Sequence, residues 1–213
     1  MSDYQRFVFD LEKRRFVGQF ELMYQAELHE GFDSWRQDDL DSRFEVAHFE
    51  RILRNHRYEK IVDVGCGKGS LTQVMSQYCE KIIGIDISDT AVGEAHRRFP
   101  SLQFQVVDIR NSGGFCDVVA REAKAGEKST LFVFSQVLSY TENWSFLLET
   151  AIEAGSDVLV ALYLPEDPIG FVKHESELLC VLQNIGTISF YAESDQTRQH
   201  VVLASPKLIG DGT

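Results

Sequence analysis

The sequence predicts a doubly wound α/β fold: a seven-stranded sheet with six parallel strands and an antiparallel last strand, covered by helices on both faces. From residue 60 onward, short runs rich in Val and Ile alternate with amphipathic stretches of helical length. The runs are apolar on both faces, which is typical of parallel strands buried under helices. The last two runs are separated only by "DQTR" (195–198), too short for a crossover helix, which predicts an antiparallel hairpin.

The N-terminal part of the chain predicts helices rather than strands. One apolar face at helical spacing is formed by Phe16, Phe20, Met23 and Tyr24. The stretch "GFDSW" (31–35) interrupts this pattern, and a second amphipathic stretch follows over residues 40–52. We therefore expect a helical lid over residues 1–56 and an α/β domain over residues 57–207, within a single structural domain.

The seven expected strands follow one another along the rest of the chain. They lie at residues 60–66, 81–88, 102–109, 130–137, 157–164, 187–194 and 199–206. Helix-like segments lie between and after the first five, at residues 70–78, 89–99, 115–124, 143–154 and 173–184. Because strand–helix–strand crossovers are right-handed, this alternation predicts one sheet with a ligand site beyond the carboxyl ends of its strands.

Composition argues against several classes of partner and location. Acidic residues outnumber basic ones by 33 to 21, giving a formal charge of −12, and this field repels nucleic acid and anionic lipid. We expect no membrane span, because no apolar run approaches the roughly 20 residues that a bilayer requires. The charged N-terminus does not resemble a secretory signal. Four cysteines without C-x-x-C spacing predict reduced thiols, no metal site and a cytoplasmic location.

The first strand ends in a glycine-rich turn, "GCGKG" (65–69). Glycines let the backbone bend tightly and let a ligand approach the main chain, although a tight turn without a ligand gives the same pattern. The dinucleotide fingerprint G-x-G-x-x-G is not met, because Ser70 occupies its sixth position. A P-loop is excluded, because only one residue separates successive glycines.

Three acids stand at or near the ends of consecutive predicted strands. Asp63 precedes the turn, Asp86 follows Gly65 by 21 residues, and Asp108 ends the third strand. An acid at the Asp86 position can accept hydrogen bonds from both ribose hydroxyls and repels a 2′-phosphate. Asp108 can accept from an amine such as adenine N6. Any one of them can also be a helix cap, but together they favour a cationic ligand that carries adenosine.

In combination these motifs resemble the cofactor half of class I S-adenosylmethionine-dependent methyltransferases, which have a Rossmann-like fold. The stretch "VDVGCGKG" resembles the family's first motif, "IGIDIS" its ribose motif, "VVDI" its adenine motif and "LFVFSQVLSY" the motif that borders the transferred methyl. The resemblance implies S-adenosylmethionine as cofactor. The contacts that it implies are Asp63, Gly65, Cys66 and Gly67 for the methionine portion, Asp86 for the ribose, Ile87, Asp108 and Ile109 for the adenine, and Ser135 on the fourth strand.

The stretch at residues 21–45 loosely resembles the lid of nodulation-type and sugar-modifying N- and O-methyltransferases. This resemblance implies that Tyr24, Trp35 and Arg43 contact the cofactor, with Arg43 as a bidentate clamp on its carboxylate. A structural reading stands beside it: Tyr24 and Trp35 can anchor helices, and Arg43 can be a solvated charge.

Methyl transfer from a sulfonium requires alignment, and it requires a base only if the acceptor holds its proton at neutral pH. Related enzymes often carry Glu where this chain has Gln136, which cannot accept a proton. We therefore predict Gln136 and Tyr140 as polar contacts in the catalytic region. His29, His48 and His174 are candidate bases or structural histidines.

These observations favour an enzyme that methylates the oxygen or nitrogen of a small molecule, such as a sugar or a natural-product intermediate. The connections after the fourth strand are too short for a large substrate domain. An alternative is a regulatory or scaffold protein that binds S-adenosylmethionine without turnover. A nicotinamide-dependent oxidoreductase is disfavoured by Ser70.

Overall fold

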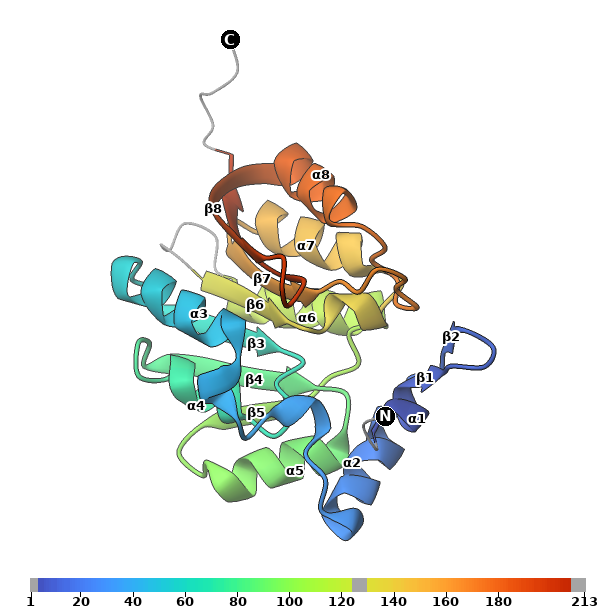
Figure 1. The fold of residues 1–213 in the computed structure, drawn as a ribbon. Helices are drawn as coiled ribbons and strands as arrows, with labels where there is room; N and C mark the ends of the chain where they lie inside the picture. Colours follow the sequence, from blue (N-terminus) through green and yellow to red (C-terminus); the bar gives the residue numbers. More distant parts are fainter. Residues whose placement is uncertain (1–3, 124–129, 208–213) are drawn as a thin grey trace.

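The computed structural model describes residues 4–123 and 130–207 and has a seven-stranded sheet between two layers of helices (Figure 1). The strand order is β5-β4-β3-β6-β7-β9-β8. The strands are β3 (Lys60–Val64), β4 (Lys81–Asp86), β5 (Gln103–Val106), β6 (Thr130–Ser135), β7 (Asp157–Tyr163), β8 (Gly186–Ser194) and β9 (Gln199–Pro206).

The directions of the strands confirm the predicted fold class. Neighbouring strands from β5 to β7 are parallel, and β9 is antiparallel to both β7 and β8. Strand β8 therefore runs in the direction of the parallel strands, and only the last strand is reversed. From β3 the chain moves to β4 and β5 on one side and then returns to β6 on the other. This switch in strand order, between β3 and β6, is where doubly wound sheets bind ligands.

Helices cover the two faces of the sheet in groups of three (Figure 1). One face carries α3 (Phe44–Asn55), α4 (Ser70–Met75) and α5 (Asp89–Arg98), and the other carries α6 (Ser112–Glu122), α7 (Trp144–Glu153) and α8 (Glu175–Ile185).

Strands β3, β4, β6, β7 and β9 contribute apolar side chains to both layers, because neighbouring residues of a strand point to opposite faces. Ile61 packs with Phe49 on the first face, and Val62 packs with Phe115 on the second. All four side chains are fully buried. Burial on both sides explains why the strands appear in the sequence as continuous apolar runs.

The N-terminal segment, residues 4–43, lies at the carboxyl ends of the parallel strands and beside α5, whereas α3 of the predicted lid packs on a face of the sheet (Figure 1). It contains α1 (Gln5–Val8), a hairpin of β1 (Phe9–Asp10) and β2 (Arg15–Phe16), α2 (Phe20–Glu30) and two short 3-10 turns (Ser34–Arg36, Leu40–Ser42) before α3. The sequence did not predict the hairpin, because two residues per strand are too few to show a period. Residues 1–3 of the predicted lid and residue 124 of a predicted helix lie outside the described residues. None of the described helices is long and apolar enough to cross a membrane.

Candidate active site

A cavity of about 550 Å³ opens at the carboxyl ends of the parallel strands, beneath the N-terminal segment. The predicted cofactor residues that line it are Tyr24, Trp35, Arg43, Asp63, Gly65, Cys66, Asp86, Ile87, Asp108, Ile109 and Ser135. The structure thus brings the three acids of consecutive strands to one hollow. Gln136 and Tyr140 line the same cavity.

Asp86, the last residue of β4, is held by two backbone donors. Its Oδ2 accepts from the Gly67 N–H at 2.9 Å and its Oδ1 from the Ser88 N–H at 3.0 Å. Burial raises the pKa of this carboxyl, although these hydrogen bonds oppose the shift. Because each carboxylate oxygen has a second lone pair, both oxygens can still accept from a pair of ligand hydroxyls.

Asp63 lies deeper, in β3, and its side chain faces α4. Its Oδ2 accepts from the Thr72 hydroxyl at 2.6 Å, and the residue is 1% exposed. Burial raises its pKa to about 6, and the nearby charge of Arg43 partly offsets this effect. The group is therefore poised to change its charge when a cation enters the cavity.

Asp108 differs from the other two acids, because Arg110 already pairs with it. The Arg110 Nε and Nη2 atoms donate to the two carboxylate oxygens at 2.9 and 2.8 Å. This forked pair lowers the pKa of Asp108. The carboxylate oxygens can still accept a hydrogen bond from an amine, but Arg110 already balances their charge.

All three glycines of the turn have positive φ, and at Gly67 (φ +54°) a neighbour also approaches the backbone closely. A Cβ there would lie 2.3 Å from Gln37 Oε1 and 2.7 Å from the Tyr24 hydroxyl. Gln37 accepts from the Lys68 N–H at 2.9 Å and donates to Tyr24 at 3.0 Å. The N-terminal segment thus covers Gly67, which lies outside the cavity lining, whereas Gly65 lines it.

Lys68 connects the glycine-rich turn to the N-terminal segment. Its ammonium lies 2.5 Å from Glu27, 3.0 Å from Asp33 and 3.1 Å from Asp38, and its side chain is 9% exposed. This cluster was not predicted from the sequence. The available signal was a lysine inside a buried turn together with an acid-rich stretch over residues 27–41.

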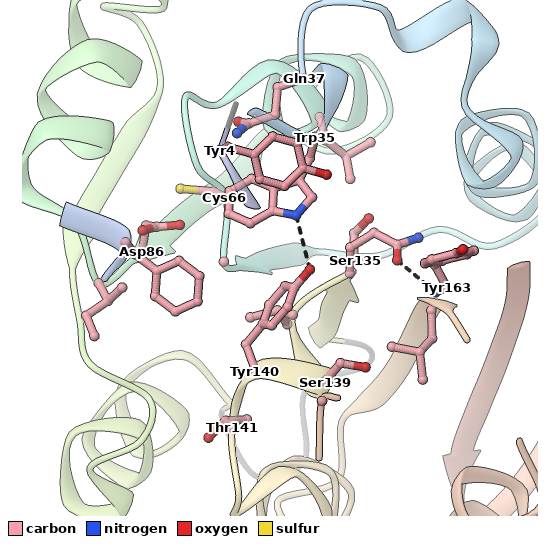
Figure 2. A pocket seen from close by; sticks show the side chains of 18 of the residues that line it. Tyr4, Trp35, Gln37, Cys66, Asp86, Ser135, Ser139, Tyr140, Thr141 and Tyr163 are labelled. Atoms are coloured by element: carbon pink, nitrogen blue, oxygen red, sulfur yellow. Dashed lines mark hydrogen bonds between the residues drawn. The ribbon is translucent and has the colours of Figure 1, made fainter. Parts of the chain in front are cut away.

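Aromatic side chains form much of the cavity wall, among them Tyr4, Phe9, Phe20, Trp35 and Tyr140. The Trp35 indole N–H donates to the Tyr140 hydroxyl at 3.1 Å, and burial raises the pKa of Tyr140. Figure 2 shows this hydrogen bond between Asp86 and Cys66 on one side and Ser135 and Tyr163 on the other. We name these two regions the Asp86 end and the Tyr163 end.

The Tyr163 end is built by the strands that follow β6. Gln136 has φ +60°, and its Oε1 accepts from the Tyr163 N–H at 2.8 Å. Gln199 pairs with Tyr163 across β7 and β9 and lines the cavity. Its buried Oε1 has no hydrogen-bond partner among the residues that the structure describes. Asp167 also lines this end, where Arg14 binds it at 2.5 Å.

The three candidate histidines lie outside the lining of the cavity. His29 is exposed near the end of α2, and His174 is exposed just before α8. His48 is half-buried on α3, where its ring packs 4.5 Å from that of Phe44, and burial lowers its pKa. Their placement gives no support to a role as base, and we do not propose one for them.

Arg43 forms an ion pair with Glu45, an acid that was not predicted from the sequence as part of the site. Its Nε and Nη2 donate to Glu45 Oε1 at 2.8 and 2.5 Å, and Nη2 also reaches the Ser135 hydroxyl at 3.3 Å. Glu45 is 2% exposed and lines the cavity. A glutamate at the start of an amphipathic helix gives no signal of such burial in the sequence.

Comparison with known proteins bears on this site. Residues 61–143 match a family model described as a methyltransferase domain. A search of curated proteins found no match to the chain.

Solved structures share the fold. The N-methyltransferase NodS from Bradyrhizobium japonicum, in complex with S-adenosyl-L-homocysteine, is 18% identical over 87% of this chain and 98% of its own, with a TM-score of 0.61. A SAM-dependent methyltransferase from Anabaena variabilis is 11% identical over 88% and 93%, with a TM-score of 0.67. The magnesium protoporphyrin IX methyltransferase from Synechocystis, with bound SAM, is 19% identical over 86% and 84%, with a TM-score of 0.55.

The matched residues hold the glycine-rich turn, all three acids and the end of β6. Because the solved structures are less than 20% identical to this chain, they show the fold alone. The family model matches the methyltransferase domain over residues 61–143. The chain thus matches a methyltransferase domain over these residues, and it shares its fold with S-adenosylmethionine-dependent methyltransferases of known structure.

Proposed function

We propose that the protein transfers the methyl group of S-adenosylmethionine to an oxygen or nitrogen of a small molecule, such as a sugar or a natural-product intermediate. The observation that carries this proposal is the buried Gln199 Oε1 at the Tyr163 end, which has no donor among the described residues. Buried polar atoms are almost always hydrogen-bonded. An acceptor with an O–H or N–H group would supply the missing donor.

The volume of the cavity and the net charge of the whole chain support a small acceptor. The cavity of about 550 Å³ has to hold both reactants, and small-molecule sites commonly have volumes of this order. The formal charge of −12 opposes nucleic acid as a partner. Among the structural neighbours, the Synechocystis enzyme is named for a small-molecule acceptor, magnesium protoporphyrin IX.

In this proposal the cofactor occupies the part of the cavity that the three acids line. Asp86 binds the ribose, Ile87, Asp108 and Ile109 surround the adenine, and Asp63 and Arg43 face the amino-acid end. The N-terminal residues 1–56 act as a lid over the domain at residues 57–207.

We also propose a cytoplasmic location, since Cys66, Cys79, Cys116 and Cys180 are all free.

Catalysis would come chiefly from alignment. In an in-line displacement the acceptor atom forms a bond to the methyl carbon while the carbon–sulfur bond breaks, and sulfur leaves as a neutral thioether. Holding the three atoms in line can supply several kcal/mol of the barrier. Gln136, fixed through its oxygen by Tyr163, would present its amide N–H to the acceptor. The acceptor's proton would leave to water.

One set of observations favours a second candidate, a protein that binds the cofactor and regulates or scaffolds a partner without turnover. Gln136 stands where a carboxylate base is common, and the three candidate histidines lie outside the cavity lining.

A turnover assay separates the two candidates. The protein is incubated with S-adenosylmethionine and a panel of sugars, amines and phenols, and S-adenosylhomocysteine is quantified. The enzyme proposal predicts product with at least one acceptor, and the Asp86→Asn variant should lose this product. Cofactor binding without product over the whole panel would favour the regulatory candidate.

A further inference from the structure

One buried carboxylate oxygen in the cavity lacks a hydrogen-bond donor. Glu45 lies in the first turn of α3, and both Arg43 contacts go to its Oε1. Its Oε2 is buried and has no partner among the residues that the structure describes. Leaving such an oxygen unpaired costs free energy, so a donor from a ligand is the natural partner.

The charges around Glu45 point to the kind of donor. Arg43 contacts Glu45 and Ser135, and its charge also lowers the pKa of Asp63, so the guanidinium lies close to both acids. The side chains of Arg43 and Glu45 are 15% and 2% exposed. With both acids ionised, the group holds two negative charges and one positive charge. This buried net negative charge attracts a cation with N–H donors.

We propose that Glu45 Oε2 binds the α-ammonium group of S-adenosylmethionine and that the Arg43–Glu45 pair forms a receptor for the zwitterionic end of the cofactor. Glu45 holds Arg43 through Oε1, which leaves the remaining guanidinium N–H groups for the cofactor carboxylate. The proposal rests on the cofactor assignment above. It makes Glu45 a cofactor-binding residue outside the glycine-rich turn.

The recognised chemistry is a protonated primary amine, which an amine acceptor could also supply. The position of the pair favours the cofactor. Arg43 lies near Asp63 in β3, the strand that leads into the glycine-rich turn, where the methionine portion is expected. Its contact with Ser135 places it at the border with the Tyr163 end, where the acceptor groups Gln136 and Gln199 lie.

Calorimetric titration with three ligands tests this assignment. The ligands are S-adenosylhomocysteine, its deaminated analogue, which keeps the carboxylate, and methylthioadenosine, which lacks the amino-acid end. Glu45→Gln should weaken binding of S-adenosylhomocysteine about 10-fold or more, the size of a lost charge-assisted hydrogen bond. Binding of the other two ligands should change less than about twofold. Glu50→Gln is the matched control, because Glu50 lies on the same helix and contacts Tyr78 outside the cavity lining.

Three results would overturn the proposal. Equal weakening of all three ligands would assign Glu45 a structural role. Unchanged affinity for S-adenosylhomocysteine, with weaker binding of amine acceptors, would assign the oxygen to the acceptor. If Glu45→Gln does not fold, the affinities of the wild-type protein for S-adenosylhomocysteine and its deaminated analogue are compared. Equal affinity for the two ligands would contradict an ammonium site. If wild-type protein binds none of the three ligands, the proposed function itself fails.

Discussion

The Lys68 ammonium lies 2.5 Å from the Glu27 carboxylate, and this buried ion pair ties the glycine-rich turn to helix α2. Burial opposes the charged form of Lys68, but the hydrogen bonds that its ammonium donates to Glu27, Asp33 and Asp38 outweigh this effect and raise the pKa of the ammonium. The glycine-rich turn, which lines the cavity through Gly65 and Cys66, therefore depends on a segment at least 30 residues earlier in the chain.

Replacing Lys68 by Met should release the N-terminal segment. Removing one partner of a buried ion cluster leaves uncompensated charge, so we expect a loss of about 3 kcal/mol in the free energy of unfolding. Denaturant unfolding measures this loss, and limited proteolysis should show faster cleavage before residue 44. Lys81→Met, at an exposed lysine, is the control. Equal stability and equal protection of both variants would contradict a clamp at Lys68.

Asp86, proposed to bind the ribose, and Asp108, proposed to contact the adenine, should contribute unequally to cofactor affinity. Asp86→Asn removes the charge of a carboxylate that has no ion-pair partner among the described residues, and we expect S-adenosylhomocysteine to bind about 10- to 100-fold more weakly. Asp108→Asn should have a smaller effect, because Arg110 already balances that charge. Calorimetry on both variants measures the difference. A larger loss for Asp108→Asn would reverse the proposed roles.

Cofactor binding should depend on pH through Asp63, whose pKa is about 6 in the free protein. The ionised carboxylate attracts the cationic cofactor, so affinity for S-adenosylmethionine should rise as the pH increases from 5 to 7. The bound cation lowers the pKa, so binding near pH 6 should release protons. Calorimetry in buffers of different ionisation enthalpy measures the release. Asp63→Asn should abolish it, and an unchanged release in that variant would point to another group.

The same residue sets an opposite trend for the stability of the free protein. Its pKa is raised in the folded state from 3.8 to about 6, so folding favours the protonated form. This contribution to stability is fully present below pH 3.8 and is lost as the pH rises through about 6. Comparing the unfolding free energies of wild type and Asp63→Asn between pH 4 and 7 isolates it. A difference that stays constant with pH would contradict the raised pKa.

Substitution at the Tyr163 end should affect turnover rather than cofactor binding. Gln136→Ala removes the amide that contacts the Tyr163 N–H and faces the acceptor region. With an acceptor found in the panel, we expect kcat/KM to fall about tenfold, while the Kd of S-adenosylhomocysteine stays within about twofold. Steady-state kinetics and calorimetry on one preparation provide both values. A parallel loss of cofactor affinity would place Gln136 at the cofactor instead.

The sheet and the cofactor end of the cavity could be predicted because their signals are local and periodic. The runs that became β3, β6 and β7 are apolar on both faces, and Asp63, Asp86 and Asp108 stand at or near strand ends in motifs that are short in sequence. Parallel strands then bring these ends together at one edge of the sheet without further information.

The partners of the glycine-rich turn could not be predicted in this way. Lys68 meets Glu27 of α2 and Asp38 of the irregular segment that follows this helix, and Gln37 covers Gly67 from just after the 3-10 turn Ser34–Arg36. Such contacts depend on how irregular segments pack in three dimensions. The burial of Glu45 has the same origin, because it follows from where the first turn of α3 meets the end of β6.

Titration of S-adenosylhomocysteine into the ligand-free protein tests most directly whether the three acids and the glycine-rich turn form a cofactor site. We predict one molecule bound per chain, with a Kd in the micromolar range or below, and a rise in the thermal unfolding midpoint that grows with ligand concentration. Absence of both binding heat and thermal stabilisation, with S-adenosylhomocysteine and with S-adenosylmethionine, would contradict that site.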